Sequence, residues 1–144
     1  MFAFFDDSQI PKIYITFNSN INDNSWKQFT NKWLTYDKKK IPYTFIFNTN
    51  GLGISLIKYT QKIAGFIKGL IKRKQKNNNV FLFQSIIVCK NTYQRRLLEM
   101  VFYIQSPVSP VYIIDDENAV EQLYNNIIRH PEFYSSDVSA YFPK

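Results

Sequence analysis

Three short apolar blocks decide the fold of this chain: YTFIF at residues 43–47, VFLFQSIIVC at 80–89 and VYII at 111–114. Two segments between them, 55–72 and 92–105, carry apolar residues three and four positions apart, which is the period of an α-helix. Strands that are apolar throughout and alternate with helices are typical of a parallel sheet covered by crossover helices. The alternation therefore predicts an α/β fold.

The residues on either side extend this pattern. Residues 2–5 and 12–17 are expected to form two short strands of a hairpin, and a helix with Trp and Phe residues on one side follows them. A last helix is expected after the third apolar block. The prediction is a single α/β domain over 1–130, with four to five mostly parallel strands and about four helices. Residues 131–144 are expected to form a C-terminal tail on the surface, since their aromatic residues show no period.

Length and composition exclude several classes of protein. The chain has 144 residues, enough for one hydrophobic core, and its hydrophobic content of 45% is ordinary for a globular protein. No apolar run approaches the roughly 20 residues that a membrane-spanning helix needs, and the start of the chain lacks the features of a signal peptide. Cys89 is the single cysteine, so we expect an intracellular, cytoplasmic protein without a disulfide. Asn, Lys, Ile and Phe have AT-rich codons, and their abundance indicates an AT-rich microbe or a large DNA virus.

The net charge of +7 is concentrated in two basic tracts. Each tract ends a predicted helix, and crossover helices of a parallel sheet all end on the same side, so we expect one basic pole. Such a pole suits an anionic surface such as phosphoinositide headgroups or RNA. The alternative is that these cations only complement helix dipoles and keep the protein soluble. The candidate anion-binding residues are Lys38, Lys39, Lys40, Lys72, Arg73, Lys74 and Lys76.

The opposite pole collects the loops that follow the strands. Ligands of open α/β sheets usually bind there, because helix N-termini offer unpaired N–H groups and glycines let the backbone approach a ligand. The alternative is that the same residues serve as helix caps and turns, since Gly-Leu-Gly is not a dinucleotide-binding fingerprint. The candidate residues of this loop pole are Asn48, Thr49, Asn50, Gly51, Gly53, Ser55 and Arg95.

No combination of residues predicts catalysis. His130 is the single histidine and stands beside Pro131, where a structural role at a helix end is favoured. Cys89 lies in an apolar block without a histidine near it in sequence to activate it. The acidic clusters have no His or Cys companions, so we expect neither a metal site nor a cofactor. The chain is predicted not to be an enzyme.

The order of blocks resembles the STAS-domain superfamily, in particular its divergent SpoIIAA-like branch. The resemblance covers roughly residues 5–125 and rests on FDD at 5–7 with IPKIYI at 10–15, PYTFIFNT at 42–49, SIIV at 85–88, RRLL at 95–98 and SPVSPVY at 106–112. It implies a small sheet flanked by helices that works by binding partners. Regulatory members carry an Asp before a phosphorylatable Ser or Thr in the loop after the second core strand. Here Asn48 stands in place of that acid, so the resemblance does not extend to a phosphorylation switch.

Two functions of different classes follow from these observations. The first is a STAS-like protein-interaction, regulatory or assembly module, with a protein partner and compatible with a homodimer. The second is a binder of anionic lipid or RNA through the basic pole. A ligand pocket at the loop pole is a third alternative.

Overall fold

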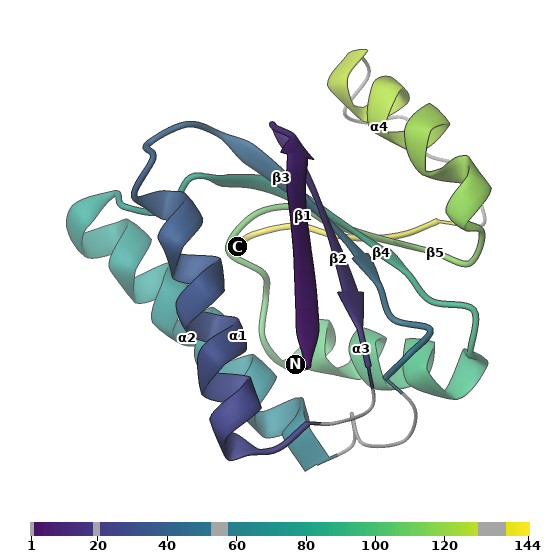
Figure 1. Cartoon of the computed structure of the whole chain (residues 1–144), viewed down its shortest axis with the longest axis horizontal. Helices are drawn as coiled ribbons and strands as arrows, with labels where there is room; N and C mark the ends of the chain where they lie inside the picture. The colour runs from purple at the N-terminus through teal and green to yellow at the C-terminus, as the bar shows by residue number, and fades with distance from the viewer. Residues whose placement is uncertain (1, 19–20, 53–57, 130–137) are drawn as a thin grey trace.

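The computed structural model describes residues 2–18, 21–52, 58–129 and 138–144, and within them it contains one six-stranded sheet (Figure 1). The strands are β1 (Ala3–Gln9), β2 (Lys12–Phe17), β3 (Tyr43–Asn48), β4 (Leu82–Val88), β5 (Val111–Ile114) and β6 (Ser139–Tyr141). They lie side by side in the order in which they occur in the sequence. β2 to β5 are parallel, whereas β1 and β6 are antiparallel strands at the two edges.

Helices cover both faces of this sheet. α1 (Asp23–Asp37), α2 (Thr60–Asn77) and α3 (Thr92–Ile104) pack on one face, called here the three-helix face. The short 3-10 helix η2 (Glu117–Ala119) leads into α4 (Val120–Arg129), which packs on the other face, called here the α4 face. Figure 1 shows α4 on the opposite side of the sheet from α1 and α2.

Alternation along the strands explains why both faces need cover. In β3, Phe45 belongs to the core under the three helices, whereas its neighbour Ile46 packs with Val120 and Leu123 of α4. Successive strand residues point to opposite faces, so a strand that is apolar at every position needs a packing partner on each side. The predicted α/β class is confirmed, with a sheet that is parallel at its centre and mixed at its edges.

The end of α1 is fixed by a buried carboxylate. Asp37 is 4% exposed, and its Oδ1 accepts hydrogen bonds from the Tyr43 hydroxyl at 2.7 Å and the Phe81 backbone N–H at 2.9 Å. Burial, followed by the bond to Asp37, raises the pKa of the Tyr43 hydroxyl well above its usual value. The phenol therefore stays protonated, and the Asp37 carboxylate joins the end of α1 to β3 and to the residue that precedes β4.

Two expectations differ from the structure. Residues 131–144 were expected to be a tail on the surface, but Ser139–Tyr141 form β6 and pair with β5, so the described sheet has six strands rather than four or five. The ring of Tyr141 packs on Phe102 of α3 at 5.5 Å between centroids, which supplies the apolar contact that holds this strand.

No helix among the described residues has both the length and the apolar character needed to cross a membrane.

Candidate functional site

The loop after β3, predicted as the centre of the loop pole, is held by its own polar side chains. Asn48 Oδ1 accepts from the Asn50 N–H at 3.0 Å, and Thr49 Oγ1 donates to the Val88 carbonyl at 2.8 Å. Thr49 is 3% exposed. These bonds tie the loop to the end of β4, so the side chains that suggested a ligand site act first as structural bonds.

Gly51 is required for packing rather than for approach to a ligand. A Cβ atom placed there would overlap the carbonyl oxygen of Phe17, at the end of β2. The loop can therefore cross this strand end only where a residue lacks a side chain. Gly53 and Ser55, the remaining predicted residues of this loop, lie outside the described residues, as does His130.

A cleft of about 220 Å³ opens beside this loop, between the α4 face and the start of α4. Tyr14, Asn48, Glu117 and Glu121 line it, and Asn48 Nδ2 donates to Glu117 Oε2 at 3.3 Å. This edge of the sheet brings together the carboxyl ends of β2, β3 and β4 and the start of η2 and α4. The sequence predicted that such strand ends and helix starts meet at the loop pole.

The charged groups of the cleft are paired. Glu121 accepts from the Tyr14 hydroxyl at 2.6 Å and from Lys12 Nζ at 2.9 Å. The bond from Tyr14, followed by the bond from Lys12, lowers the pKa of Glu121. Burial, followed by the bond to Glu121, raises the pKa of Tyr14 to about 12. Both shifts move the pKa values further from 7, so these groups are poorly suited to proton transfer near neutral pH. The bonds of Glu121 to Tyr14 and Lys12 instead anchor α4 to β2.

Arg95, predicted for the loop pole, is engaged in bonds within the fold. Its guanidinium forms an ion pair with Glu99 at 3.3 Å and donates to the carbonyl of Ile113 at 3.2 Å and to Ser139 Oγ at 2.9 Å. Ser139 Oγ in turn donates to Glu99 Oε1 at 3.1 Å. The prediction placed Arg95 beside the ligand edge because it lies one turn into α3. The structure turns its side chain towards β5 and β6, where it joins the helix to the last strand.

The two basic tracts share one end of the molecule, as predicted. α1 and α2 lie side by side and end on the same side of the sheet (Figure 1). Arg73 of α2 lies close enough to Tyr43 for its charge to act on the pKa of that hydroxyl, which is bonded to Asp37 at the end of α1. Lys74 Nζ donates to the Val108 carbonyl at 3.4 Å, so one of the predicted anion-binding residues is partly engaged in the fold.

The basic surface is larger than the two tracts. Twelve of the eighteen Lys and Arg residues lie between residues 23 and 77, where Asp23 and Asp37 are the only acidic residues. Asp37 is buried, so it adds little negative charge to the surface. The α1–α2 layer is therefore strongly basic, whereas the rest of the chain is slightly acidic.

The outer face of α3 is apolar and exposed, which sequence reasoning missed. Ile104 continues the apolar spacing of Leu98 and Val101, yet it is 74% exposed, and Tyr103 is 85% exposed. Tyr93 and Met100 are about half exposed and lie on the same face at helical spacing. The buried face of α3 is also apolar, so periodicity alone could not show which residues face the sheet. The outer face of α3 is defined here as Tyr93, Arg96, Met100, Tyr103 and Ile104.

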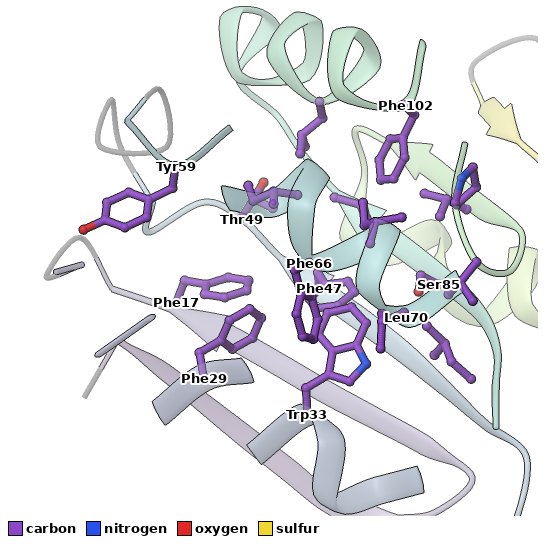
Figure 2. A pocket seen from close by; sticks show the side chains of 18 of the residues that line it. Phe17, Phe29, Trp33, Phe47, Thr49, Tyr59, Phe66, Leu70, Ser85 and Phe102 are labelled. Carbon is purple, nitrogen blue, oxygen red and sulfur yellow. The ribbon is translucent and has the colours of Figure 1, made fainter. Parts of the chain in front are cut away.

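A partly open apolar cavity of about 120 Å³ lies between the three-helix face and its helices (Figure 2). Aromatic rings of Phe17, Phe29, Trp33, Phe47 and Phe66 stand around it. The cavity was not predicted, because its existence depends on how the helices meet and not on any local pattern.

Comparisons with protein-family models, with curated proteins and with solved structures found no match.

Proposed function

We propose that this chain is a non-catalytic, STAS-like interaction module that binds a protein partner through the outer face of α3. The observation that carries this proposal is the exposure of four large apolar side chains on one side of a single helix: Tyr93 at 54%, Met100 at 49%, Tyr103 at 85% and Ile104 at 74%. Exposed apolar residues scattered singly are ordinary, but a contiguous group of them marks an interaction surface.

The helix that carries this face is firmly held. Leu98, Val101 and Phe102 are buried against the sheet, and Asn91 caps the helix by accepting from the Gln94 N–H at 3.0 Å. The Arg95–Glu99 pair adds polar bonds to β5 and β6. A surface on a rigid helix loses little conformational entropy on binding, which favours affinity.

The residues of this face also suggest the chemistry of the partner. Tyr, Met and Arg are enriched at protein interfaces, and Tyr and Arg are frequent among the residues that contribute most to affinity. Arg96 is exposed, whereas the only acidic residue of α3, Glu99, is paired with Arg95. The partner we infer is a separate protein that offers an apolar groove with an acidic residue at its border, opposite Arg96.

The STAS-like assignment is part of this proposal. It is supported by the arrangement of a hairpin, α1 and then three strand–helix units, the block order on which the resemblance rests. A phosphorylation switch in the loop is not included, because the Thr49 hydroxyl is buried and bonded to Val88.

Copurification from the native host tests this function. The tagged wild-type chain and the tagged Ile104→Asp variant are each isolated, and the proteins that accompany them are compared by quantitative mass spectrometry. Phe4→Asp is the matched control, since Phe4 is 64% exposed on an edge strand and points to the α4 face. We expect a partner that is retained by wild type and Phe4→Asp and lost by Ile104→Asp. A partner set identical for all three chains contradicts the proposal, as does a complex that consists only of copies of this chain.

The basic α1–α2 layer supports a second candidate function, the binding of RNA. In α2, whose residues are all described, Lys62, Lys68, Lys72 and Lys76 are exposed, and no large exposed apolar side chain interrupts them. Gly65 and Gly69 lie in open space on this helix, so a phosphate backbone can approach closely. A membrane-binding helix usually adds apolar residues that enter the lipid, which α2 does not present.

Fluorescence anisotropy with a labelled single-stranded RNA at several salt concentrations tests this second function. We expect the logarithm of the affinity to fall with the logarithm of salt by about 0.7 for each phosphate contact. The variant K68Q/K72Q/K76Q should lose most of the binding, whereas Lys90→Gln, which changes a lysine paired with Glu117, should not. Equal binding by both variants, or binding to anionic vesicles without binding to RNA, refutes the RNA function.

A further inference from the structure

The partly open cavity between the three-helix face and its helices is long and narrow. Its wall follows one side of α1, through Trp26, Phe29 and Trp33, and one side of α2, from Ile63 to Leu70. Each of these stretches covers about two helix turns, or roughly 10 Å, since an α-helix rises about 1.5 Å per residue. A volume of about 120 Å³ spread over that length leaves a passage of small cross-section.

The aromatic rings around this passage hold one another in place. The ring of Trp33 lies 5.2 Å from that of Phe66 and 5.6 Å from that of Phe47, measured between centroids. Phe29 packs edge-on against Trp33 at 5.9 Å. Because each ring is packed against its neighbours, no single side chain can turn to fill the space, and the wall is rigid.

One end of the cavity reaches the surface. Figure 2 shows Phe17 and Tyr59 at one end and Leu70 towards the other, where Leu70 is 1% exposed. The described lining residues that are only partly buried lie near the end of β2 and the starts of α1 and α2: Phe17, Ile21, Trp26, Ile63 and Phe66. The mouth of the cavity is therefore between the starts of α1 and α2.

The surface beside this mouth carries a net positive charge. Lys62 Nζ lies 5.2 Å from the centroid of the Tyr59 ring, which lines the cavity, and forms an ion pair with Asp23 at the start of α1. Lys58 adds a second exposed positive charge. Ion pairs between exposed side chains contribute little to stability, so a carboxylate that arrives at the mouth can take the place of Asp23.

We propose that the cavity binds the alkyl chain of a fatty acid, whose carboxylate remains in solvent at the mouth. The wall is almost wholly apolar, and none of the described residues that line it is charged, so the wall suits a hydrocarbon. An engineered apolar cavity of about 150 Å³ stays dry and takes up benzene. Here the narrow passage favours a straight chain over a ring, and the open end spares the carboxylate the cost of burial.

This inference does not rest on the proposed partner surface. The outer face of α3 lies in solvent, whereas Leu98 and Phe102 on the inner side of the same helix line the cavity. The two proposals therefore fail separately.

Octanoate and adamantane carboxylate separate the shape of the ligand from its charge, since both carry one carboxylate but only octanoate has a straight chain. The full-length chain, ¹³C-labelled at the methyl groups of Ile, Leu and Val, is titrated with each probe and followed by NMR. We expect saturable shifts at Ile67, Leu70 and Ile87 with octanoate only. Hexanoate should bind about tenfold more weakly than octanoate, because each buried methylene contributes roughly threefold to fourfold in affinity.

The variant Ile63→Trp tests the mouth. Ile63 is only partly buried, so the larger ring narrows the opening without entering the deep part of the core. We expect the dissociation constant of octanoate to rise about tenfold or more, the effect of losing roughly two buried methylenes. Gln61→Trp is the matched control, because it adds the same ring to an exposed position of α2 that does not line the cavity, and it should leave the affinity unchanged.

Thermal unfolding shows whether each variant is folded. If Ile63→Trp does not fold, the comparison of the three probes on the wild-type chain decides the question. The inference is overturned if octanoate gives no saturable shifts at the cavity residues, if adamantane carboxylate binds there as tightly, or if folded Ile63→Trp and Gln61→Trp bind octanoate equally.

Discussion

The loop after β3 and the outer face of α3 show how differently polar and apolar residues signal a site. The loop contains Asn48, Thr49 and Gly51, residue types that are common in ligand sites, yet each has a structural contact within the fold. The outer face of α3 contains residue types that are common in cores, yet Tyr103 and Ile104 lie in solvent. A residue indicates function when its chemistry is not used by the fold, and that can be judged only from its contacts.

The largest expected effect comes from Gly51→Ala. The new methyl group overlaps the Phe17 carbonyl, so the loop or the end of β2 must move. We expect the free energy of unfolding to fall by about 3 kcal/mol, at the upper end of the usual cost of overpacking, as measured by urea denaturation.

Gly65→Ala is the matched control for that variant. Gly65 lies in α2 with open space around it, so alanine should raise the free energy of unfolding by roughly 0.5–1 kcal/mol through better helix propensity. If Gly51→Ala were as harmless as Gly65→Ala, the loop would not be packed on β2, and its residues would again be candidates for a ligand site.

Thr49→Val should have an intermediate effect. The change keeps the shape of the side chain and removes the hydrogen bond to the Val88 carbonyl, which still accepts from the Thr49 backbone N–H. We expect a loss of about 1 kcal/mol in urea denaturation. A variant as stable as wild type would show that the hydroxyl is not needed by the fold.

A smaller effect on stability is expected from Glu121 when the pH is lowered, because its side chain is largely exposed and solvent screens its bonds. The folded state lowers the pKa of Glu121, so this group contributes stability above its ordinary pKa of 4.5, and the contribution is lost as the pH falls below that value. Melting temperatures measured between pH 7 and pH 3 should therefore fall less steeply for Glu121→Gln than for wild type. Identical slopes would show that the contacts with Tyr14 and Lys12 do not persist in solution.

The smallest effect on stability is expected on the outer face of α3. Tyr103→Ser combined with Ile104→Ser removes two side chains that are mostly in solvent, so the free energy of unfolding should change by less than about 0.5 kcal/mol. A loss above about 2 kcal/mol in urea denaturation would mean that these residues pack within the fold, and the comparison with the loop would fail.

Much of the fold could be predicted from the sequence, because its central strands are apolar on both faces. Phe45 and Ile46 are neighbours that pack on opposite sides of the sheet, and such continuous apolar blocks are typical of parallel strands. β6 could not be predicted, since it has three residues and is held by pairing with β5 and by the contact of Tyr141 with Phe102. Those interactions join residues far apart in the chain.

The candidate site was less predictable, for a physical reason. The basic tracts and the loop pole follow from helix direction, and the structure shows that α1 and α2 end on the same side of the sheet. The exposure of Ile104 could not be predicted because α3 is apolar on both sides, so its orientation is decided by packing with the sheet and by the bonds of Arg95 to β5 and β6. The cavity depends on how three helices meet one sheet, which no local pattern encodes.

Hydroxyl-radical footprinting of the native complex tests the docking role of α3 most directly, because Met and Tyr side chains are oxidised readily when exposed. The chain isolated alone and the chain in its copurified complex are oxidised side by side, and modification is measured at Met100 and Tyr103, with Phe4 as the internal control. We predict that oxidation of Met100 and Tyr103 falls severalfold in the complex while that of Phe4 is unchanged. Equal oxidation of Met100 and Tyr103 in both samples would contradict the proposal that the outer face of α3 binds the partner.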